Sequence, residues 1–372
     1  MSTVFAPAKF DRDISVRQLL APLERFFALP GVTEIVINRP NELMYEQGAV
    51  WTTEAVEDLP YERLHSLIRA IATYTDQDIG PLTPVLSAVL PEGQRVQIVV
   101  PPVVEAGTVS LSIRLPASTI RSLDDYEADG AFGSFCWAAP PADLSVVDGL
   151  STIDQYLMTC LRTRNLKAFL LDAVLARRNI AIVGDTGSGK TTLMKSLCHH
   201  IPNAERIITI EDVRELSLPN HANKVHLLYS KGGQGVARVT PADLIAATMR
   251  MRPDRVLLAE LRGSEAFDFL KLLTTGHSGS ITSFHAESCA LALERYVLMA
   301  KEHPDAAIFD AAGLKRLVTL TLDIIVHMKT ETVTDRDGHR HKARVVGEVH
   351  FNPVAKVGER FGGNAIALGA VS

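Results

Sequence analysis

Apolar residues recur with two different periods along the first 116 residues. Four stretches, in which apolar residues either alternate with polar ones or run together and close on proline, predict strands. They span residues 32–38, 43–51, 95–102 and 108–116. Residues 61–75 instead repeat their apolar positions every three or four residues, which predicts an amphipathic helix with one buried stripe. We therefore expect an N-terminal α+β domain over residues 1–116.

Residues 117–153 follow neither period. They are rich in glycine, proline, alanine and serine, a composition typical of connections. We interpret this stretch as an interdomain linker.

From residue 154 onward, short apolar runs alternate with helical periods. Residues 154–178 have helical spacing, and each of the next apolar runs is followed by a helical stretch. The strands expected here are NIAIVG, RIITIED, RVLLAEL and SITSFHA. Strands and helices in alternation predict βαβ units and a largely parallel sheet. Two closing strands, LTLDIIVHMK and ARVVGEVHF, are expected to pair through TDRDGHRH, which completes an α/β domain over residues 154–372.

The composition narrows the class of protein. The net charge is −5, from 38 basic and 43 acidic residues, so bulk charge favours neither nucleic acid nor an anionic membrane as a partner. The four cysteines form no C-x-x-C pair, which fits free thiols in a reducing compartment. The first residues lack the signature of a signal peptide, and no apolar run reaches the roughly 18 residues of a membrane span. A cytosolic protein of two domains is expected.

One segment points to nucleotide chemistry. Residues 184–191, GDTGSGKT, match the phosphate-binding loop G-x-x-x-x-G-K-S/T, with an apolar strand before it and a helix after it. Its glycines let backbone N–H groups turn toward a β-phosphate, and the helix N-terminus adds partial positive charge. Lys190 is expected to reach the β- and γ-phosphates of ATP, and the Thr191 hydroxyl to bind Mg²⁺.

The whole loop is expected to contact the nucleotide. Its residues are Gly184, Asp185, Thr186, Gly187, Ser188, Gly189, Lys190, Thr191 and Thr192. The alternative, a glycine-rich turn with a surface lysine, is weaker because the flanking strand and helix are those that a phosphate loop requires.

Acidic residues end two of the predicted strands. RVLLAEL places Ala259 where a second-strand aspartate is usual and leaves Glu260 as its acid. TIEDVREL ends another apolar run with Glu211 and Asp212. Because parallel sheets bind ligands at the carboxyl ends of their strands, these acids are expected to converge on the phosphates. Taken singly, each could instead be a helix cap or a solvated group.

Residues 275–286, TGHSGSITSFHA, hold two histidines eight positions apart, His277 and His285. That spacing suits neither the i, i+4 geometry of a metal-binding helix nor a zinc finger. A phosphate sensor, a catalytic base and a buried structural pair remain open from the residues alone.

Four segments together resemble a known family. GDTGSGKTTLMK, TIEDVRELSLP, RPDRVLLAELRG and TGHSGSITSFHA occur in the order of Walker A, Asp box, atypical Walker B and His box. This set resembles the type II/type IV secretion ATPase superfamily and, within it, the VirB-type traffic ATPases of type IV secretion systems. VTEIVINRPNELMYE, LPEGQRVQIVVPP and SLDDYEADGAF resemble that family's N-terminal domain and linker, so the likeness spans nearly the whole chain.

The resemblance implies a RecA-like P-loop domain and a role for each box. His277 and His285 would lie beside the γ-phosphate and report nucleotide state, with His285 the more structural of the two. Glu211 would orient or deprotonate the attacking water. Glu260 would complete the Mg²⁺ shell with Thr191.

Arginines acquire roles by the same resemblance. Arg95 and Arg114 match arginines of the N-terminal domain that approach the phosphates across the interdomain cleft. Arg250 and Arg262 flank the Walker B strand and match arginines that can act across a subunit boundary. For each of them, a surface ion pair is the alternative.

The resemblance implies a homohexamer that hydrolyses Mg-ATP to power pilus assembly and the transfer of protein or DNA. It would work on the cytoplasmic face of the bacterial inner membrane, held there by channel components and a coupling protein. A type II secretion or type IV pilus motor is one alternative, although TIEDVRELSLP is closer to the type IV secretion form. A DNA translocase or helicase with the same core, and an assembly scaffold with negligible turnover, are two more.

Overall fold

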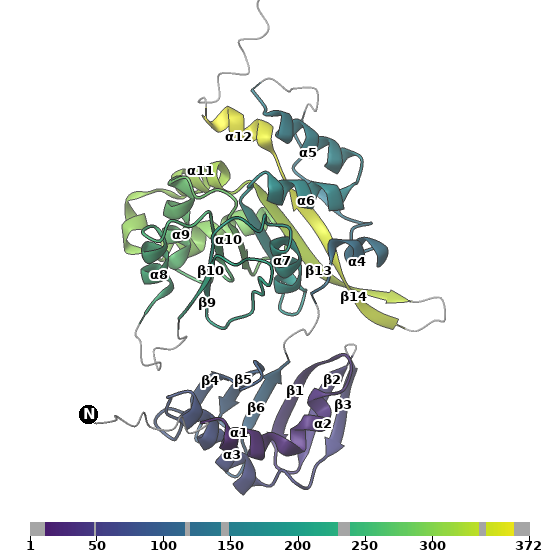
Figure 1. Cartoon of the computed structure of the whole chain (residues 1–372), viewed down its shortest axis with the longest axis vertical. Coiled ribbons are helices and arrows are strands. Elements are labelled where there is room, and N and C mark those ends of the chain that lie inside the picture. The colour runs from purple at the N-terminus through teal and green to yellow at the C-terminus, as the bar shows by residue number, and fades with distance from the viewer. Residues whose placement is uncertain are drawn as a thin grey trace, which may run out of the picture. The chain divides into compact units, whose positions relative to one another are not determined.

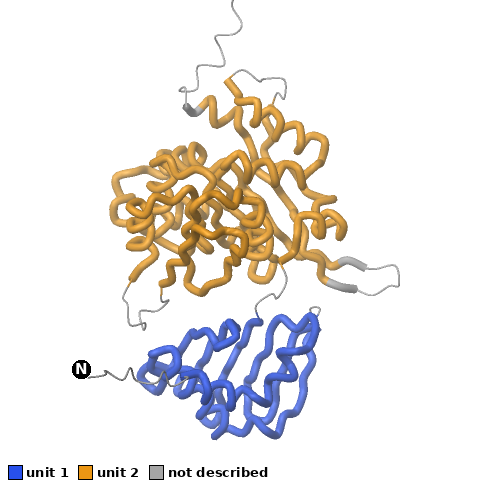
Figure 2. The backbone as a smooth tube through the Cα atoms, in the orientation of Figure 1, with its two compact units in different colours: residues 1–118, 230–238 blue, residues 119–229, 239–372 orange. Residues whose placement is uncertain are grey.

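The computed structural model describes residues 12–47, 50–115, 120–142, 149–229, 239–334 and 340–360. They form two compact units (Figure 2). The first holds the described residues up to 115, and the second holds those from 120 onward. Each unit has its own sheet and its own hydrophobic core.

The first unit is built on a six-stranded antiparallel sheet with the order β3-β2-β1-β6-β5-β4 (Figure 1). Its strands are β1 (Val32–Arg39), β2 (Glu42–Gln47), β3 (Val50–Ala55), β4 (Val85–Val89), β5 (Arg95–Val99) and β6 (Ser110–Arg114). Its helices are α1 (Ile14–Leu20), the 3-10 helix η1 (Ala21–Leu23), α2 (Glu24–Phe27) and α3 (Tyr61–Tyr74).

Helix α3 shows why these residues form a core. The helix starts after Pro60, whose extended backbone excludes this residue from it. The stripe predicted from the sequence is buried throughout, at Leu64, Leu67, Ile68 and Ile71. Strands β5 and β6 bury alternate residues against the same core, as a half-buried sheet requires. Strand β4 is missing from the prediction because its five residues are flanked by prolines and resemble a loop.

The stretch interpreted as a linker, residues 117–153, contains secondary structure that belongs to the second unit. Helix α4 (Leu123–Ala128) begins at a capping box in which Ser122 and Asp125 satisfy each other's backbone N–H groups. Strand β7 (Cys136–Ala138) pairs in parallel with β14, at the edge of the larger sheet. A strand of three residues has no readable period, so only its pairing partner defines it.

The second unit is built on an eight-stranded sheet with the order β10-β9-β11-β12-β8-β13-β14-β7. Its other strands are β8 (Ile180–Gly184), β9 (Ile207–Glu211), β10 (Lys224–Leu228), β11 (Arg255–Leu258), β12 (Ile281–Phe284), β13 (Ile324–Thr334) and β14 (Arg340–His350). Every neighbouring pair is parallel except β13 with β14. The predicted α/β fold with a mainly parallel sheet is confirmed.

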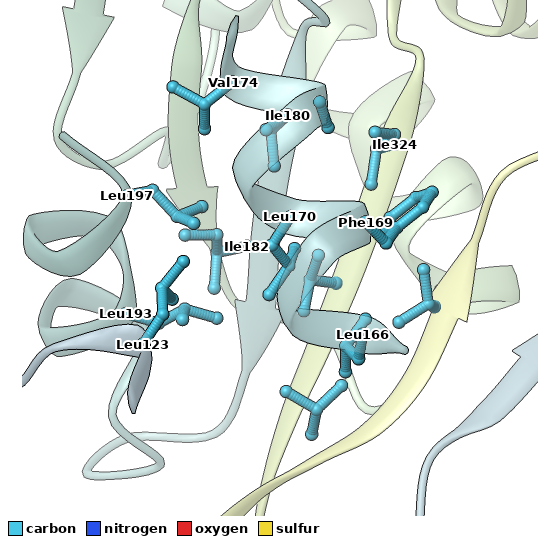
Figure 3. Close-up of a cluster of buried hydrophobic side chains, with 14 of the residues drawn as sticks. Leu123, Leu166, Phe169, Leu170, Val174, Ile180, Ile182, Leu193, Leu197 and Ile324 are labelled. Carbon is cyan, nitrogen blue, oxygen red and sulfur yellow. The ribbon is translucent and has the colours of Figure 1, made fainter. Parts of the chain in front are cut away.

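Helices cover both faces of this sheet (Figure 1). They are α5 (Thr152–Arg162), α6 (Leu166–Leu175), α7 (Lys190–Cys198), α8 (Pro241–Thr248), α9 (Glu265–Thr274), α10 (Cys289–Lys301), the 3-10 helix η2 (Pro304–Ile308), α11 (Ala311–Thr321) and α12 (Pro353–Arg360). Strand β8 is buried on both sides, with Ile180 and Ile182 facing α6 and α7 (Figure 3) and Ala181 and Val183 facing the opposite core. This double burial explains why its sequence is apolar without alternation.

The single helix expected over residues 154–178 is two helices. Arg164 adopts a left-handed conformation with φ 59°, which ends α5. Asn165 then caps α6 by accepting a hydrogen bond from the N–H of Ala168 at 3.1 Å. The apolar period continues through the break because both helices pack on the same core, so periodicity alone cannot reveal it. Among the described residues, no helix is long and apolar enough to span a membrane.

Candidate functional site

The phosphate loop lies at the centre of the large sheet. Strand β8 ends at Gly184, and α7 begins at Lys190. Gly184 has φ 147°, and a Cβ there would collide with the backbone carbonyl of Met328 on the neighbouring strand β13. No other residue fits this position, so the first glycine of the motif is required by the packing of two strands. Gly187 and Gly189 also have positive φ, at 77° and 95°, and complete the tight turn.

The ammonium group of Lys190 lies over this loop. It donates to the carbonyl oxygens of Gly184 and Asp185, at 2.8 and 2.7 Å, and lies 3.3 Å from Nδ1 of His285. The side chain is almost completely buried, at 8% exposure. A buried cation that is held by loop carbonyls is well placed to neutralise phosphate oxygens bound inside the same loop.

Polar side chains at the carboxyl ends of three strands form a continuous chain that starts at Lys190. His285 follows β12, and its Nε2 lies 3.3 Å from Oε1 of Glu260, which follows β11. Oε2 of Glu260 accepts a hydrogen bond from Arg262 at 2.6 Å, and Arg262 also donates to Asp212, beyond β9, at 2.7 Å. We call these five residues the relay. The relay brings together two cations, a histidine and two acids, because the carboxyl ends of parallel strands meet at the same edge of a sheet.

Arg262 is fixed within its own subunit. Its two terminal nitrogens, Nη1 and Nη2, each face a carboxylate, and burial acts against its charge. The hydrogen bonds and charges of Glu260 and Asp212 outweigh burial, and the pKa of Arg262 is raised. The guanidinium therefore keeps its charge and holds the two acids in position.

Glu211 is placed differently from the other acids. Its side chain is completely buried at the end of β9, and both carboxylate oxygens already have partners. Oε1 lies 2.7 Å from the Thr209 hydroxyl and 3.1 Å from Nδ1 of His226, while Oε2 accepts from the N–H groups of Glu215 and Leu216 at 2.7 and 2.8 Å. A carboxylate has about four acceptor sites, so none is left for a water molecule in this conformation. Sequence reasoning missed His226, which lies on β10, a strand that it did not predict.

The two histidines of TGHSGSITSFHA lie at opposite edges of the sheet. His285 comes directly after β12, at the edge that carries the phosphate loop. His277 precedes β12, and its Nδ1 lies 3.2 Å from the hydroxyl of Thr275. The four residues of the strand alone separate the edges by about 13 Å. The expectation that both histidines lie beside the γ-phosphate therefore differs from the structure, which brings only His285 to the loop of its own subunit.

The first half of that segment has a packing role instead. Gly279 has φ 86°, and a Cβ there would meet the guanidinium of Arg255 at 3.0 Å. Its N–H and that of Ser280 both donate to Oδ1 of Asn179, at 2.9 and 3.1 Å. Arg255 is fully buried and forms a two-point ion pair with Glu205, at 2.6 and 3.0 Å. The glycine is thus needed for close approach to a buried cation.

The remaining predicted arginines lie elsewhere. Arg95 and Arg114 belong to the first unit and stand directly opposite each other on β5 and β6. Arg114 also faces Glu34, with the charged atoms 3.7 Å apart. Arg250 is exposed just beyond the end of α8, and its side chain makes no ion pair with any residue that the structure describes.

The fold and the loop define a P-loop nucleotide-binding protein. Residues 150–348 match the family described as Type II/IV secretion system protein, and the chain belongs to this family. It is 42% identical over 351 residues to the Type IV secretion system protein VirB11 of Brucella suis, with 94% of this chain and 93% of that protein covered. It is 43% identical over 338 residues to the Type IV secretion system protein PtlH of Bordetella pertussis, with coverages of 90% and 95%.

The chain is also similar to a solved structure over most of its length. The crystal structure of the VirB11 ATPase from the Brucella suis type IV secretion system, in complex with sulphate, is 42% identical to this chain and has a TM-score of 0.52. The similarity covers 94% of this chain and 98% of that one. These findings confirm the predicted family and its RecA-like fold. With the phosphate loop, they make the chain an ATP-hydrolysing enzyme.

Proposed function

We propose that this ATPase hydrolyses Mg-ATP to power type IV secretion. The observation that supports this most directly is the relay, because it links Lys190 of the phosphate loop to the acids and the histidine of three strand ends. In phosphoryl transfer, positioning and electrostatic stabilisation supply most of the catalysis. The relay provides both at one edge of a rigid sheet.

The loop from Gly184 to Thr192 holds the phosphates of ATP in this proposal. Lys190 leaves its carbonyl partners and neutralises the β- and γ-phosphate oxygens. Thr191 and Glu260 supply oxygen ligands to Mg²⁺, which prefers such ligands and keeps several waters. When bound, Mg²⁺ would neutralise the charge that develops on the transferred phosphoryl group.

We assign the sensing of the γ-phosphate to His285 and not to His277. His285 already contacts both Lys190 and Glu260, so any movement of the lysine toward phosphate changes its surroundings. Such a local change, produced by γ-phosphate contacts, is the usual origin of P-loop switching. His277 then has no role in the chemistry of its own subunit.

Glu211 and Glu260 divide the acidic roles. Glu260 is the acid beside the phosphate loop, through His285. Glu211 fixes the backbone after β9 by accepting from Glu215 and Leu216. For Glu211 to activate water, as the resemblance implies, its carboxylate would first have to release these N–H groups. Its participation in hydrolysis is therefore coupled to movement of the segment after β9.

Arg95, Arg114 and Arg250 stay predictions as phosphate ligands. What supports the first two is local: they lie directly opposite each other on β5 and β6, and like charges so placed in a sheet are unfavourable. An anion would relieve that repulsion. Arg250 is exposed and suited to a role across a subunit boundary, whereas Arg262 acts within its own subunit.

The working assembly in this proposal is a homohexamer on the cytoplasmic face of the bacterial inner membrane. Inner-membrane channel components and a coupling protein would hold it there and would receive the transferred protein or DNA. The support is the similarity to VirB11 and PtlH, which are named as type IV secretion system proteins.

The first measurement is the native mass of the full chain with Mg²⁺ and a non-hydrolysable ATP analogue. We expect a particle of six subunits, and a persistent monomer or dimer would contradict the ring. Turnover should not respond to single-stranded DNA. Strong stimulation by it would favour the translocase alternative.

A further inference from the structure

The direction of the bound nucleotide follows from the strand order. Strands β12, β11 and β9, which carry His285, Glu260 and Asp212 at their ends, all lie on one side of β8. If the relay faces the γ-phosphate, the phosphate chain must run across the loop toward the other side. That side is formed by β13 and β14. The α-phosphate, the ribose and the base therefore extend toward these two strands.

One arginine on that side rests on the phosphate loop itself. Arg344 lies on β14, opposite Thr330 of β13. A Cβ placed on Gly189 would lie 3.2 Å from Cδ and 3.7 Å from Cβ of Arg344. The aliphatic part of this side chain thus covers the last glycine before Lys190. Packing of the stem limits the conformations of this side chain.

The guanidinium of Arg344 is exposed and makes no hydrogen bond or ion pair with any part of the chain that the structure describes. A second cation, Arg121, already has partners. Arg121 lies over the ring of Tyr126, with its guanidinium carbon 3.9 Å from the ring centre, and is paired with Asp129 at 2.6 Å. Arg344 is therefore a cation beside the loop whose charge has no partner among the described residues.

The charge of Arg344 acts on a buried tyrosine, Tyr126. The tyrosine is buried and stacks on Phe132 with the ring centres 5.3 Å apart. Burial raises the pKa of its hydroxyl, and the charges of Arg121 and Arg344 act in the opposite direction. Arg121, which covers the ring of Tyr126, and Arg344 therefore both act electrostatically on this tyrosine, which packs in the core on the face of the sheet that α7 covers.

We propose that Arg344 binds the α-phosphate of the nucleotide. This inference rests on the proposed function, because it takes the orientation of ATP from the relay. Arginine suits this role because its planar fork of donors matches two phosphate oxygens and stays charged at any physiological pH. The contact is the same in ADP and ATP, so it contributes to binding and not to the chemical step.

The test compares the full-length protein with three variants. Arg344→Gln keeps the stem over Gly189 and removes the charge, and Arg344→Lys keeps the charge and removes the fork. Lys342→Gln is the matched control, because Lys342 is exposed two residues away on the same strand. ADP and inorganic pyrophosphate are titrated by calorimetry, and ATP turnover is measured in parallel.

Arg344→Gln should weaken ADP binding and raise KM for ATP by about tenfold to a hundredfold, as expected for a charge-assisted hydrogen bond. Its kcat should change by less than about twofold. Pyrophosphate occupies only the β and γ positions, so its affinity should not change. Arg344→Lys should bind ADP with an affinity between those of the wild type and Arg344→Gln. Lys342→Gln should match the wild type.

Other results would distinguish a failure of the Arg344 proposal from a failure of the proposed function. Unchanged ADP affinity in Arg344→Gln would overturn the proposal and leave the side chain only a cover for Gly189. Equal loss of ADP and pyrophosphate binding would also overturn it, because the contact would then be to the β- or γ-phosphate. If the wild type bound neither ligand, the proposed function itself would fail.

Discussion

The two edges of the parallel sheet show how one sequence segment can serve two purposes. At the carboxyl edge, His285 lies within reach of Lys190 and Glu260, and its surroundings are polar and half-exposed. At the amino edge, the same segment packs Gly279 against the buried guanidinium of Arg255. The first edge places groups for chemistry, and the second holds strands β8, β11 and β12 together. The sequence offers both His277 and His285 as contacts of the γ-phosphate, but the direction of strand β12 sends them to opposite edges of the sheet.

The largest expected effect is at the carboxyl edge. Lys190→Ala should reduce ATP turnover by about a thousandfold or more, because no other buried cation of the loop can neutralise the γ-phosphate. Phosphate release measures this loss. Lys195→Ala, on the last turn of the same helix, is the control and should retain turnover. Retained turnover in Lys190→Ala would refute the assignment of the loop.

The next effect is at the amino edge and concerns stability. Arg255→Met should lower the free energy of unfolding by about 3 kcal/mol, since it removes the two-point ion pair of Glu205 and leaves that acid only Arg177, at 3.5 Å. Chemical denaturation of the second unit measures the change. The double variant Arg255→Met with Glu205→Leu should recover part of it. If the folded Arg255→Met protein instead showed a large change in KM for ATP, the separation between the two edges would be wrong.

The sharpest comparison uses the same substitution at both edges. His285→Asn should lower kcat by about a hundredfold, as the loss of one preorganised contact to the reacting phosphate does. His277→Asn should leave kcat within about twofold. Both are measured by steady-state ATP hydrolysis, with thermal unfolding as a check on the fold. A larger loss for His277→Asn than for His285→Asn would return the sensing role to His277, acting across a subunit boundary.

Much of the site was readable because it is local. The loop from Gly184 to Thr191 is a continuous motif, and Glu260 and Asp212 end apolar runs whose strands are easily recognised. A helix such as α3 was predicted because its buried stripe repeats over fourteen residues, Tyr61–Tyr74. Such features depend on neighbours in sequence, so they can be predicted from periodicity and motif spacing.

Other features could not be predicted from neighbours in sequence. Strand β7 exists only through its pairing with β14, more than two hundred residues later. Arg344 acquires its place through the order of β8, β13 and β14, and nothing within its own segment sets it apart from Lys342. One partner of Glu211, His226, likewise comes from β10, a strand that is only partly buried and weakly patterned.

The sequence by itself determined that this chain binds phosphate and belongs to the secretion ATPases, because the loop and the other three boxes are short continuous signals. Only the tertiary structure decided which acids and which histidine meet at the nucleotide. It did so because parallel strands send residues that precede them and residues that follow them to opposite edges. A spacing of eight residues can therefore separate two side chains, whereas a strand order can join groups that lie far apart in the chain.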